Sequence, residues 1–277
     1  MTITSRQNAL VARFRDAARG DAGGVMLLDG AHLVADAIAA RIGITIAAVT
    51  PAARGRGEIE RLVDALSAAG ATVSTVAQPV MDAISPVRSA SGIVALAERP
   101  EAGGDRLYAG AEPLVVIAVD VQDPGNVGAI VRVAEAAGAT GFVAAGASAN
   151  PYGWKALRGS MGSGLRLPLT SGDGHAAAVA EARRRGCRIV ATATRGGVPI
   201  FDAALTGALA VLIGGEGPGL PTALVDAADE RVTIPMKAPV ESLNAAVTAG
   251  VVLFEIQRRR HEIKDGRHKT QDGRQKI

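Results

Sequence analysis

Residues 231–254 read RVTIPMKAPVESLNAAVTAGVVLF, and this stretch decides how the end of the fold is built. Its β-branched start predicts a short strand, with Pro235 near the strand's end, where a missing N–H does little harm to a ladder. A proline-containing loop, 237–241, comes next. Apolar residues then recur with the spacing of one buried helix face: Leu243, Ala246, Val247, Gly250, Val251 and Phe254.

The expected helix begins with the polar sequence Ser-Leu-Asn at 242–244. Glu241 or Ser242 is the expected cap, which would put Ser242 and Asn244 in the first turn, where free backbone N–H groups point outward. Two interpretations fit this sequence: a capped core helix, or a binding site at the start of a helix. Taken alone, the stretch favours the capped core helix.

The composition of the 277 residues predicts one large domain or two ordinary ones. Apolar residues make up 48% and aromatic residues 3%, which predicts a core of Ala, Val, Leu and Ile. No apolar run approaches the roughly 20 residues of a membrane span, and the N-terminus lacks the apolar segment of a secretory signal. The single cysteine, Cys187, excludes an internal disulfide framework and favours a cytoplasmic protein, with Cys187 as a small buried side chain.

Positive charge gathers at the C-terminus. The chain has a net charge of +3, but residues 258–277 carry +5, which leaves −2 for residues 1–257. This basic tail contains Arg258, Arg259, Arg260, Lys264, Arg267, Lys269, Arg274 and Lys276. A tail that contacts nucleic acid and a disordered solubilising tail both fit this pattern.

Two segments alternate between expected strands and helices, which predicts an α/β fold for each. The first is 1–99. A linker, 100–112, is rich in Pro, Gly and charged residues and has no apolar period. The second segment, 113–257, begins with a continuous apolar run typical of a strand buried in a parallel sheet.

A tight turn follows the strand that ends at Asp120, with the sequence Asp-Pro-Gly-Asn at 123–126. Asn126 is the expected cap of the next helix. A strand, a turn and a helix place polar groups at the carboxyl edge of a parallel sheet, where open α/β folds bind ligands. Arg132 lies inside this otherwise apolar helix. It either reaches a surface carboxylate such as Glu135 or points at a phosphate or a developing alkoxide.

A glycine-rich turn, GGEGPGL at 214–220, follows another expected strand. Its glycines let the backbone approach a ligand closely. The spacing does not fit the dinucleotide fingerprint, so a nicotinamide-dependent enzyme is poorly supported. Most turns of this kind are only turns, but Glu216 has no role in a core and is a candidate functional residue.

Together these three segments resemble the three motifs of the SpoU (TrmH-like) family of RNA ribose 2′-O-methyltransferases, within the SPOUT superfamily. The family's first motif is matched by Asp120, Asp123, Pro124, Asn126, Gly128 and Arg132, the second by Gly214, Glu216, Gly217, Gly219 and Leu220, and the third by Ile234, Pro235, Met236, Ser242, Leu243 and Asn244. Residues 160–168 also resemble a loop of the family. The resemblance covers 113–257.

The chain departs from the family at two places, with Ala238 where glycine is frequent and Ala246 where the family has serine. Ala246 removes any role for a hydroxyl at that position. The N-terminal segment resembles, more weakly, the L30e-like substrate-binding domain of many SpoU members, with Asp29 in the usual position of a glutamate.

The resemblance implies a trefoil-knotted catalytic domain that works as a homodimer and whose site may use residues of both subunits. It also implies S-adenosylmethionine as methyl donor, with no metal; the sequence itself contains no cluster of His and Cys ligands. The residues expected to bind the donor are Leu212, Gly214, Gly215, Gly217, Ile234, Met236, Ser242 and Leu243.

The implied reaction moves a methyl group to a ribose 2′-oxygen of RNA, with ribosomal RNA favoured over transfer RNA. The expected catalytic residues are Arg132, Asn126, Glu216, Ser242 and Asn244. Because arginine stays protonated, stabilisation of the forming alkoxide is a better role for Arg132 than that of a base.

The RNA is expected to contact Lys155, Arg158 and Arg166. Trp154 and Tyr152 either stack on a base or pack beneath their loop. Two alternatives remain open for the whole chain: a non-catalytic RNA-binding protein and a base-methylating enzyme of the same superfamily.

Overall fold

The computed structural model describes residues 2–20, 22–100, 103–172 and 174–272, with side chains described as far as residue 262. Contacts divide the chain into two units. The N-terminal unit contains residues 1–101 and 150–166, and the C-terminal unit contains 102–149 and 167–277. The segment 150–166 therefore belongs with the N-terminal unit, although the sequence places it inside the second α/β segment.

The N-terminal unit is built on a mixed sheet in the order β1-β4-β2-β3. Its strands are β1 (Val25–Asp29), β2 (Ile44–Val49), β3 (Thr72–Thr75) and β4 (Ile93–Glu98). Its helices are α1 (Ala9–Arg19), α2 (Ala31–Ala39), α3 (Pro51–Arg54), α4 (Gly57–Ala68), α5 (Gln78–Ile84), α8 (Trp154–Ser160) and the 3₁₀ turn η1 (Ser163–Leu165). Phe14 of α1 and Met81 of α5 are fully buried in the core on one face of this sheet.

The C-terminal unit contains a parallel sheet in the order β7-β6-β5-β10-β8-β11-β9. Its strands are β5 (Leu114–Val119), β6 (Gly141–Ala145), β7 (Leu169–Ser171), β8 (Arg188–Thr192), β9 (Val198–Pro199), β10 (Leu209–Gly214) and β11 (Glu230–Thr233). Every residue of β5 is buried, which fits its continuous apolar sequence. The predicted α/β fold is confirmed.

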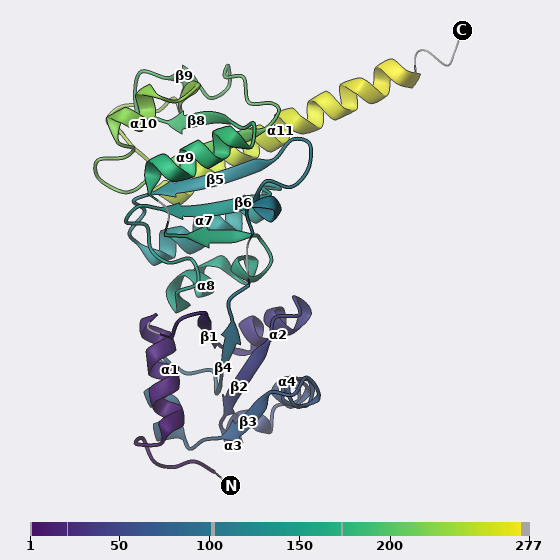
Figure 1. Ribbon diagram of the computed structural model, residues 1–277, viewed down its shortest axis with the longest axis vertical. Coiled ribbons are helices and arrows are strands. Elements are labelled where there is room, and N and C mark those ends of the chain that lie inside the picture. Colours follow the sequence, from purple (N-terminus) through teal and green to yellow (C-terminus); the bar gives the residue numbers. More distant parts are fainter. Residues whose placement is uncertain (1, 21, 101–102, 173, 273–277) are drawn as a thin grey trace. The chain divides into compact units, whose positions relative to one another are not determined.

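Helices cover both faces of this sheet (Figure 1). They are α6 (Gly104–Leu107), α7 (Pro124–Ala136), α9 (His175–Arg184), α10 (Thr222–Asp226) and α11 (Ala245–Asp272). In Figure 1, α9 lies over the face nearer the viewer and α11 behind the sheet, where it packs beside α7. Helix α6 falls in the predicted linker, and its Leu107 is buried against the sheet.

The C-terminal helix α11 is longer than the sequence predicts, because it continues through Phe254 to Asp272 and includes the start of the basic tail. Three of the tail's arginines are used inside the fold. Arg258 and Arg259 pair with Glu255, and Arg260 donates to the carbonyl oxygens of Pro113 and Gly207. The remaining basic residues of the tail lie outside the described side chains.

Two smaller expectations can also be compared with the structure. Cys187 is buried, as predicted, and burial raises the pKa of its thiol. Within the described residues, no helix has the length and apolar character that crossing a membrane requires.

Candidate active site

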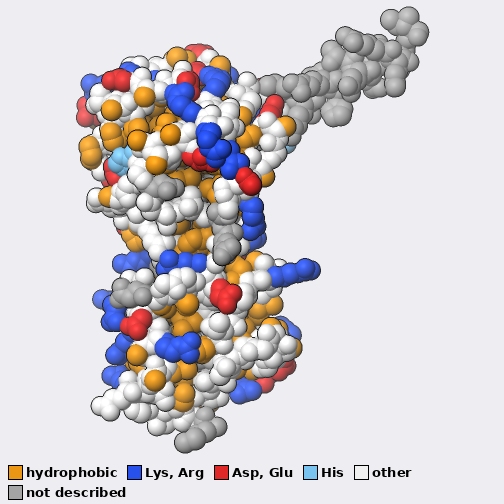
Figure 2. Space-filling view, in the orientation of Figure 1, with side chains coloured by type: hydrophobic (Ala, Val, Ile, Leu, Met, Phe, Trp, Pro, Cys, Tyr) orange, Lys and Arg blue, Asp and Glu red, His pale blue; other side chains and the backbone are white. Residues whose placement is uncertain are grey.

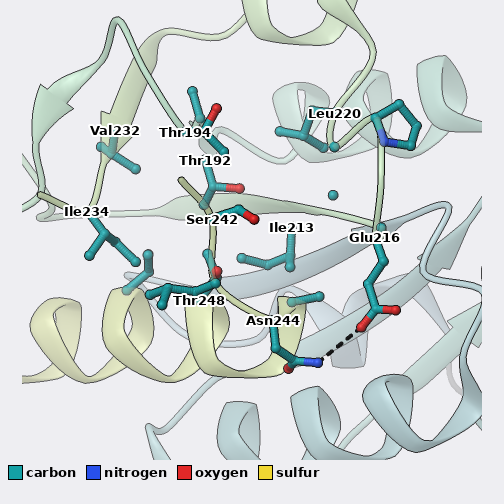
Figure 3. Close-up of a pocket in the computed structure, with 18 of the residues that line it drawn as sticks. Thr192, Thr194, Ile213, Glu216, Leu220, Val232, Ile234, Ser242, Asn244 and Thr248 are labelled. Carbon is teal, nitrogen blue, oxygen red and sulfur yellow. Dashed lines mark hydrogen bonds between the residues drawn. The ribbon is translucent and has the colours of Figure 1, made fainter. Parts of the chain in front are cut away.

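A cavity of about 520 Å³ opens at the carboxyl ends of β8, β10 and β11 (Figure 3). This is the edge of a parallel sheet at which α/β folds bind ligands, and the volume is within the roughly 300–1,000 Å³ of small-molecule sites. Its lining comes from Thr192, Ala193, Thr194, Arg195, Ile213, Gly214, Gly215, Glu216, Gly217, Pro218, Gly219, Leu220, Val225, Val232, Ile234, Met236, Ser242, Leu243, Asn244, Ala245, Thr248 and Val252.

At Gly214 and Gly215 the glycine-rich turn after β10 passes too close to other backbone for a side chain. A Cβ at Gly215 would lie 2.1 Å from the carbonyl oxygen of Asp120. One at Gly214 would lie 2.6 Å from the carbonyl carbon of Gly219. These glycines are therefore needed for the turn to close against the loop after β5, and they leave its peptide groups facing the cavity.

Helix α7 begins earlier than predicted. Asp123, rather than Asn126, is its N-cap, and the Asp123 carboxylate accepts a hydrogen bond of 2.8 Å from the backbone N–H of Asn126. Pro124 then occupies the first helical position, which proline prefers. Asn126 consequently lies in the first turn, and its carboxamide is free to reach outside its own helix.

Helix α11 begins later than predicted, at Ala245. The side chain of Asn244 caps it, since Oδ1 accepts hydrogen bonds from the backbone N–H groups of Ala246 at 2.9 Å and Val247 at 3.3 Å. Ser242 and Leu243 thus precede the helix instead of lying in its first turn. This arrangement occupies the oxygen of the Asn244 carboxamide and points its nitrogen toward the glycine-rich turn.

Three side chains from three separate segments meet at the rim of the cavity. Asn126 Nδ2 donates to Glu216 Oε1 at 2.6 Å. Asn244 Nδ2 lies 3.0 Å from Asn126 Oδ1 and 3.1 Å from Glu216 Oε1, and Figure 3 draws the contact between Asn244 and Glu216. We call these residues the Asn–Glu–Asn cluster. Its donors are neutral amides, so the negative charge of Glu216 is not balanced by a cation within the cluster.

A match to a family model decides which family this fold and cluster represent. Residues 113–254 match the model of the family described as the SpoU rRNA Methylase family. The chain belongs to the SpoU family.

Relatives with this family's activities align with most of the chain. An uncharacterized tRNA/rRNA methyltransferase of Synechocystis is 28% identical over 265 residues, which are 94% of each chain. The 23S rRNA (guanosine(2553)-2′-O)-methyltransferase RlmP of Bacillus subtilis is 26% identical over 231 residues, 83% of this chain and 88% of that protein.

Solved structures agree with this assignment. An S-adenosylmethionine-bound rRNA methyltransferase of Sinorhizobium meliloti has a TM-score of 0.83 and 26% identity, and the match covers 94% of this chain and 98% of the other. A structure described as an RNA 2′-O ribose methyltransferase has a TM-score of 0.78 and 29% identity, over 94% and 99% of the two chains. The predicted family is confirmed.

The structure brings most of the expected donor-binding residues of the SpoU motifs to the cavity. Its lining includes Gly214, Gly215, Gly217, Ile234, Met236, Ser242 and Leu243. Leu212 does not line the cavity. Its side chain is fully buried in the core on the α9 side of the sheet, and its carbonyl oxygen accepts from the Thr192 hydroxyl at 2.9 Å. Because side chains alternate along a strand, the neighbouring Ile213 faces the cavity instead.

Arg132 of the first SpoU motif does not join the cluster. It is exposed on α7, is absent from the cavity lining, and makes no hydrogen bond or ion pair within residues 103–172 and 174–262. It lies six residues after Asn126, which corresponds to about 120° around the helix and about 9 Å along it. The two side chains therefore leave α7 in different directions.

Asp120, the first residue of the first SpoU motif, has a neighbour that the sequence does not predict. Its backbone has a φ of 54°, in the left-handed region. Oδ1 accepts from the backbone N–H of Ala147 at 2.7 Å and lies 2.9 Å from Nε2 of His175. The backbone hydrogen bond is the main cause that lowers the pKa of Asp120, with His175 adding to it. No pattern in the sequence connects His175, 55 residues later, to this loop.

The expected RNA contacts lie in the N-terminal unit. Lys155 and Arg158 are exposed on α8, while Arg166 pairs with Asp36 at 3.6 Å. Tyr152 is buried, with its hydroxyl 3.5 Å from the carbonyl oxygen of Pro100, which supports the packing interpretation for that ring.

Trp154 is half-buried against the core of the N-terminal unit, and Lys155 Nζ lies 5.5 Å from the centre of its ring. No group of three His, Cys, Asp or Glu side chains that could hold a metal occurs in the part of the chain that the structure describes.

Proposed function

We propose that this chain transfers a methyl group from S-adenosylmethionine to a ribose 2′-oxygen of RNA. The observation that carries the proposal is the Asn–Glu–Asn cluster, which joins all three SpoU motifs at the rim of a glycine-lined cavity. The names of relatives that align with most of the chain include 2′-O-methylation of ribosomal RNA.

The residues of the cavity fit the chemistry of this donor. Ile234, Met236 and Leu243 offer apolar surface to a purine ring, and the peptide groups of 214–217 offer hydrogen bonds to its polar edge. The carboxylate of Glu216 accepts hydrogen bonds only from the amides of Asn126 and Asn244, so its negative charge can attract a cationic ligand. When bound, the donor supplies a methyl group made electrophilic by a positively charged sulfur.

In this proposal the chain's own residues position the acceptor and stabilise charge. Asn126, Asn244 and Ser242 orient the ribose and its neighbouring phosphate by hydrogen bonds. Arg132 stabilises the negative charge that develops on the 2′-oxygen, because a guanidinium does not lose its proton at neutral pH. The proton of the 2′-hydroxyl passes to a phosphate oxygen of the RNA or to water.

We further propose a homodimer in which Arg132 acts in the partner's cavity. Within one chain Arg132 does not line the cavity, so a second chain must supply it or the helix must move. The expectation that Leu243, Val247 and Phe254 lie on a buried helix face is wrong, because the buried side chains of α11 include Ala249, Val252 and Leu253. Val247 and Phe254, seven residues apart on α11, are instead 52% and 48% exposed, as apolar side chains of a subunit interface would be in one chain alone. The family's trefoil knot and a cytoplasmic location are part of the same proposal.

Ribosomal RNA is the proposed substrate, in preference to transfer RNA. Lys and Arg side chains gather on the face of the N-terminal unit drawn in Figure 2, and Lys155 and Arg158 are exposed on its helix α8. Such a surface suits the RNA backbone, whose phosphates dominate affinity. A relative that aligns with most of this chain is named as a 23S rRNA enzyme.

The test is transfer of labelled methyl groups from S-adenosylmethionine to ribosomal and transfer RNA from cells that lack the enzyme, followed by digestion to nucleosides. We expect a 2′-O-methylnucleoside from ribosomal RNA, and no label with Arg132→Ala. Label on a base would overturn the proposed chemistry and favour the base-methylating alternative. RNA binding without donor binding or label would favour a non-catalytic RNA-binding protein.

A further inference from the structure

Arg195 lies in the loop after β8 and lines the cavity, but it belongs to none of the three motifs. Its Nη2 atom is 2.7 Å from Oε1 of Glu241, in the loop before α11. The two side chains are 79% and 76% exposed, so the pair spans two loops at the mouth of the cavity and not its floor.

The charges of the cavity are few and opposite. Among its described lining residues, Arg195 is the only cation and Glu216 the only anion. Figure 3 places Thr194, which directly precedes Arg195, across the cavity from Glu216. A ligand that enters therefore meets negative charge on the side of the Asn–Glu–Asn cluster and positive charge on the side of the β8 loop.

We propose that Arg195 binds the carboxylate of the amino-acid part of the methyl donor and that Glu241 holds the guanidinium in place before the donor enters. This inference rests on the proposed function. S-adenosylmethionine carries one carboxylate beside an ammonium group. Glu216 would attract the sulfonium and the ammonium and repel the carboxylate, which Arg195 would attract. The two charged residues thus fix which end of the donor lies near the acceptor.

Replacement of Glu241 by the donor carboxylate as the partner of Arg195 costs little free energy. An ion pair between two exposed side chains contributes little, because both groups remain hydrated. A guanidinium binds a carboxylate through two parallel N–H donors, and it does so more strongly when water is excluded by a ligand that fills the cavity. A donor carboxylate can therefore displace Glu241.

An RNA phosphate is the other anion that could pair with Arg195. The donor carboxylate is favoured because Arg195 lines the cavity itself, beside Thr194 and Ser242, and because no other cation lines it among the described residues. A binding experiment without RNA separates the two partners, and a methyl-transfer assay of the same variants then measures the KM for RNA.

The experiment is calorimetric binding of two ligands, S-adenosylmethionine and its decarboxylated form, which differ only in the carboxylate. The variants are Arg195→Gln, Glu241→Gln and, as a matched control, Arg231→Gln, whose arginine is paired with Asp226 but does not line the cavity. We expect Arg195→Gln to weaken binding of S-adenosylmethionine about tenfold and to leave the decarboxylated form unchanged. Removal of the competing carboxylate in Glu241→Gln should tighten binding of S-adenosylmethionine about threefold.

Three results would overturn the inference. Equal weakening of both ligands by Arg195→Gln would show a loop effect, and no weakening of either would show that the carboxylate has no contact with Arg195. Unchanged binding together with a raised KM for RNA would assign Arg195 to a phosphate. If the unaltered protein binds neither ligand, the proposed function fails as well, which distinguishes that failure from a failure at Arg195 alone.

Discussion

Two glutamates lie at helix α11, one within the helix and one beside its first residue, and they differ in how their charge is balanced. In the middle of the helix, Glu255 is 8% exposed and accepts from Arg258 at 2.8 Å and from Arg259 at 2.7 Å. At the start of the helix, Glu216 is exposed and accepts only from the amides of Asn126 and Asn244.

We propose that this difference separates a structural carboxylate from a functional one. The hydrogen bond from Arg258 and the neighbouring Arg259 lower the pKa of Glu255 to about 2, and the charges cancel inside the fold. Glu216 keeps an uncancelled negative charge at a cavity, and Arg132 keeps an uncancelled positive charge on α7. Both charges are therefore free to meet a ligand or a partner, and we expect one to complete each of them.

Loss of the positive charge of Arg132 should have the largest effect on the methyl-transfer rate. Arg132→Ala is expected to lower kcat about 10³-fold, because it removes stabilisation of the forming alkoxide. Binding of S-adenosylmethionine and the melting temperature should not change, since the side chain is exposed and has no partner within the described part of its chain. Arg132→Lys, which keeps the charge, should recover part of the rate. Equal kcat for Ala and Lys would show that charge at this position is not what matters.

Loss of the negative charge of Glu216 should have the next largest effect on activity. Glu216→Gln keeps the size of the side chain and is expected to lower kcat/KM about 10²-fold. The variant should weaken binding of the cationic S-adenosylmethionine more than that of the neutral thioether S-adenosylhomocysteine, because only the charge has been removed. Titration of both ligands measures this ratio, and an unchanged ratio would contradict an electrostatic role for Glu216.

The balanced glutamate should affect stability and not chemistry. Glu255→Gln is expected to lower the free energy of unfolding by about 2 kcal/mol, because two arginines lose a charged acceptor. Its folded pKa of about 2 lies below the ordinary 4.5, so the contribution is complete above pH 4.5 and is lost as the pH falls from 4.5 to about 2.

Denaturant titrations at pH 7 and pH 3 measure this contribution, and the difference between variant and parent should be smaller at pH 3. The matched control is Glu262→Gln, which removes an exposed partner of Arg258 and should change stability by less than about 1 kcal/mol. A large loss of activity in Glu255→Gln under conditions where it is folded would remove the distinction between the two glutamates.

The smallest effect is expected at the proposed RNA surface. The double change Lys155→Ala and Arg158→Ala should raise KM for RNA a few-fold. It should also reduce the slope of log binding constant against log salt concentration by the amount expected for the loss of about one to two phosphate contacts. Arg166→Ala, which removes a residue already paired with Asp36, should do less. An unchanged salt dependence would exclude α8 from the RNA contact.

Much of this site follows from sequence, because its parts are local. The continuous apolar run of β5, the turn after it and the glycines after β10 each dictate a short conformation. The cap of α7 can also be predicted from the sequence, since proline prefers the first helical position and Pro124 therefore indicates Asp123 as the cap. For α11 the sequence points to Glu241 or Ser242 as the cap, whereas Asn244 is the cap in the fold, because serine and asparagine side chains cap helices about equally well.

The remaining errors concern contacts that form only in the folded chain. Side-chain alternation within a buried strand places Leu212 in the core and Ile213 at the cavity, and the sequence of an all-apolar strand does not say which face is which. The apolar pattern of α11 ends at Phe254, yet the helix continues, with pairs four residues apart such as Glu255 and Arg259 to support it. The contact between His175 and Asp120 has no local signal.

The most direct test of the account is a hybrid dimer of Arg132→Ala and Glu216→Gln chains, co-expressed with two different affinity tags and purified through both. If Arg132 acts in the partner's cavity, one site of each hybrid contains both unaltered residues, and the hybrid should recover about half of the methyl-transfer rate of the unaltered dimer. If the hybrid is as inactive as the two variants alone, Arg132 and Glu216 serve the same chain's site, and the proposed division of the active site between two subunits is contradicted.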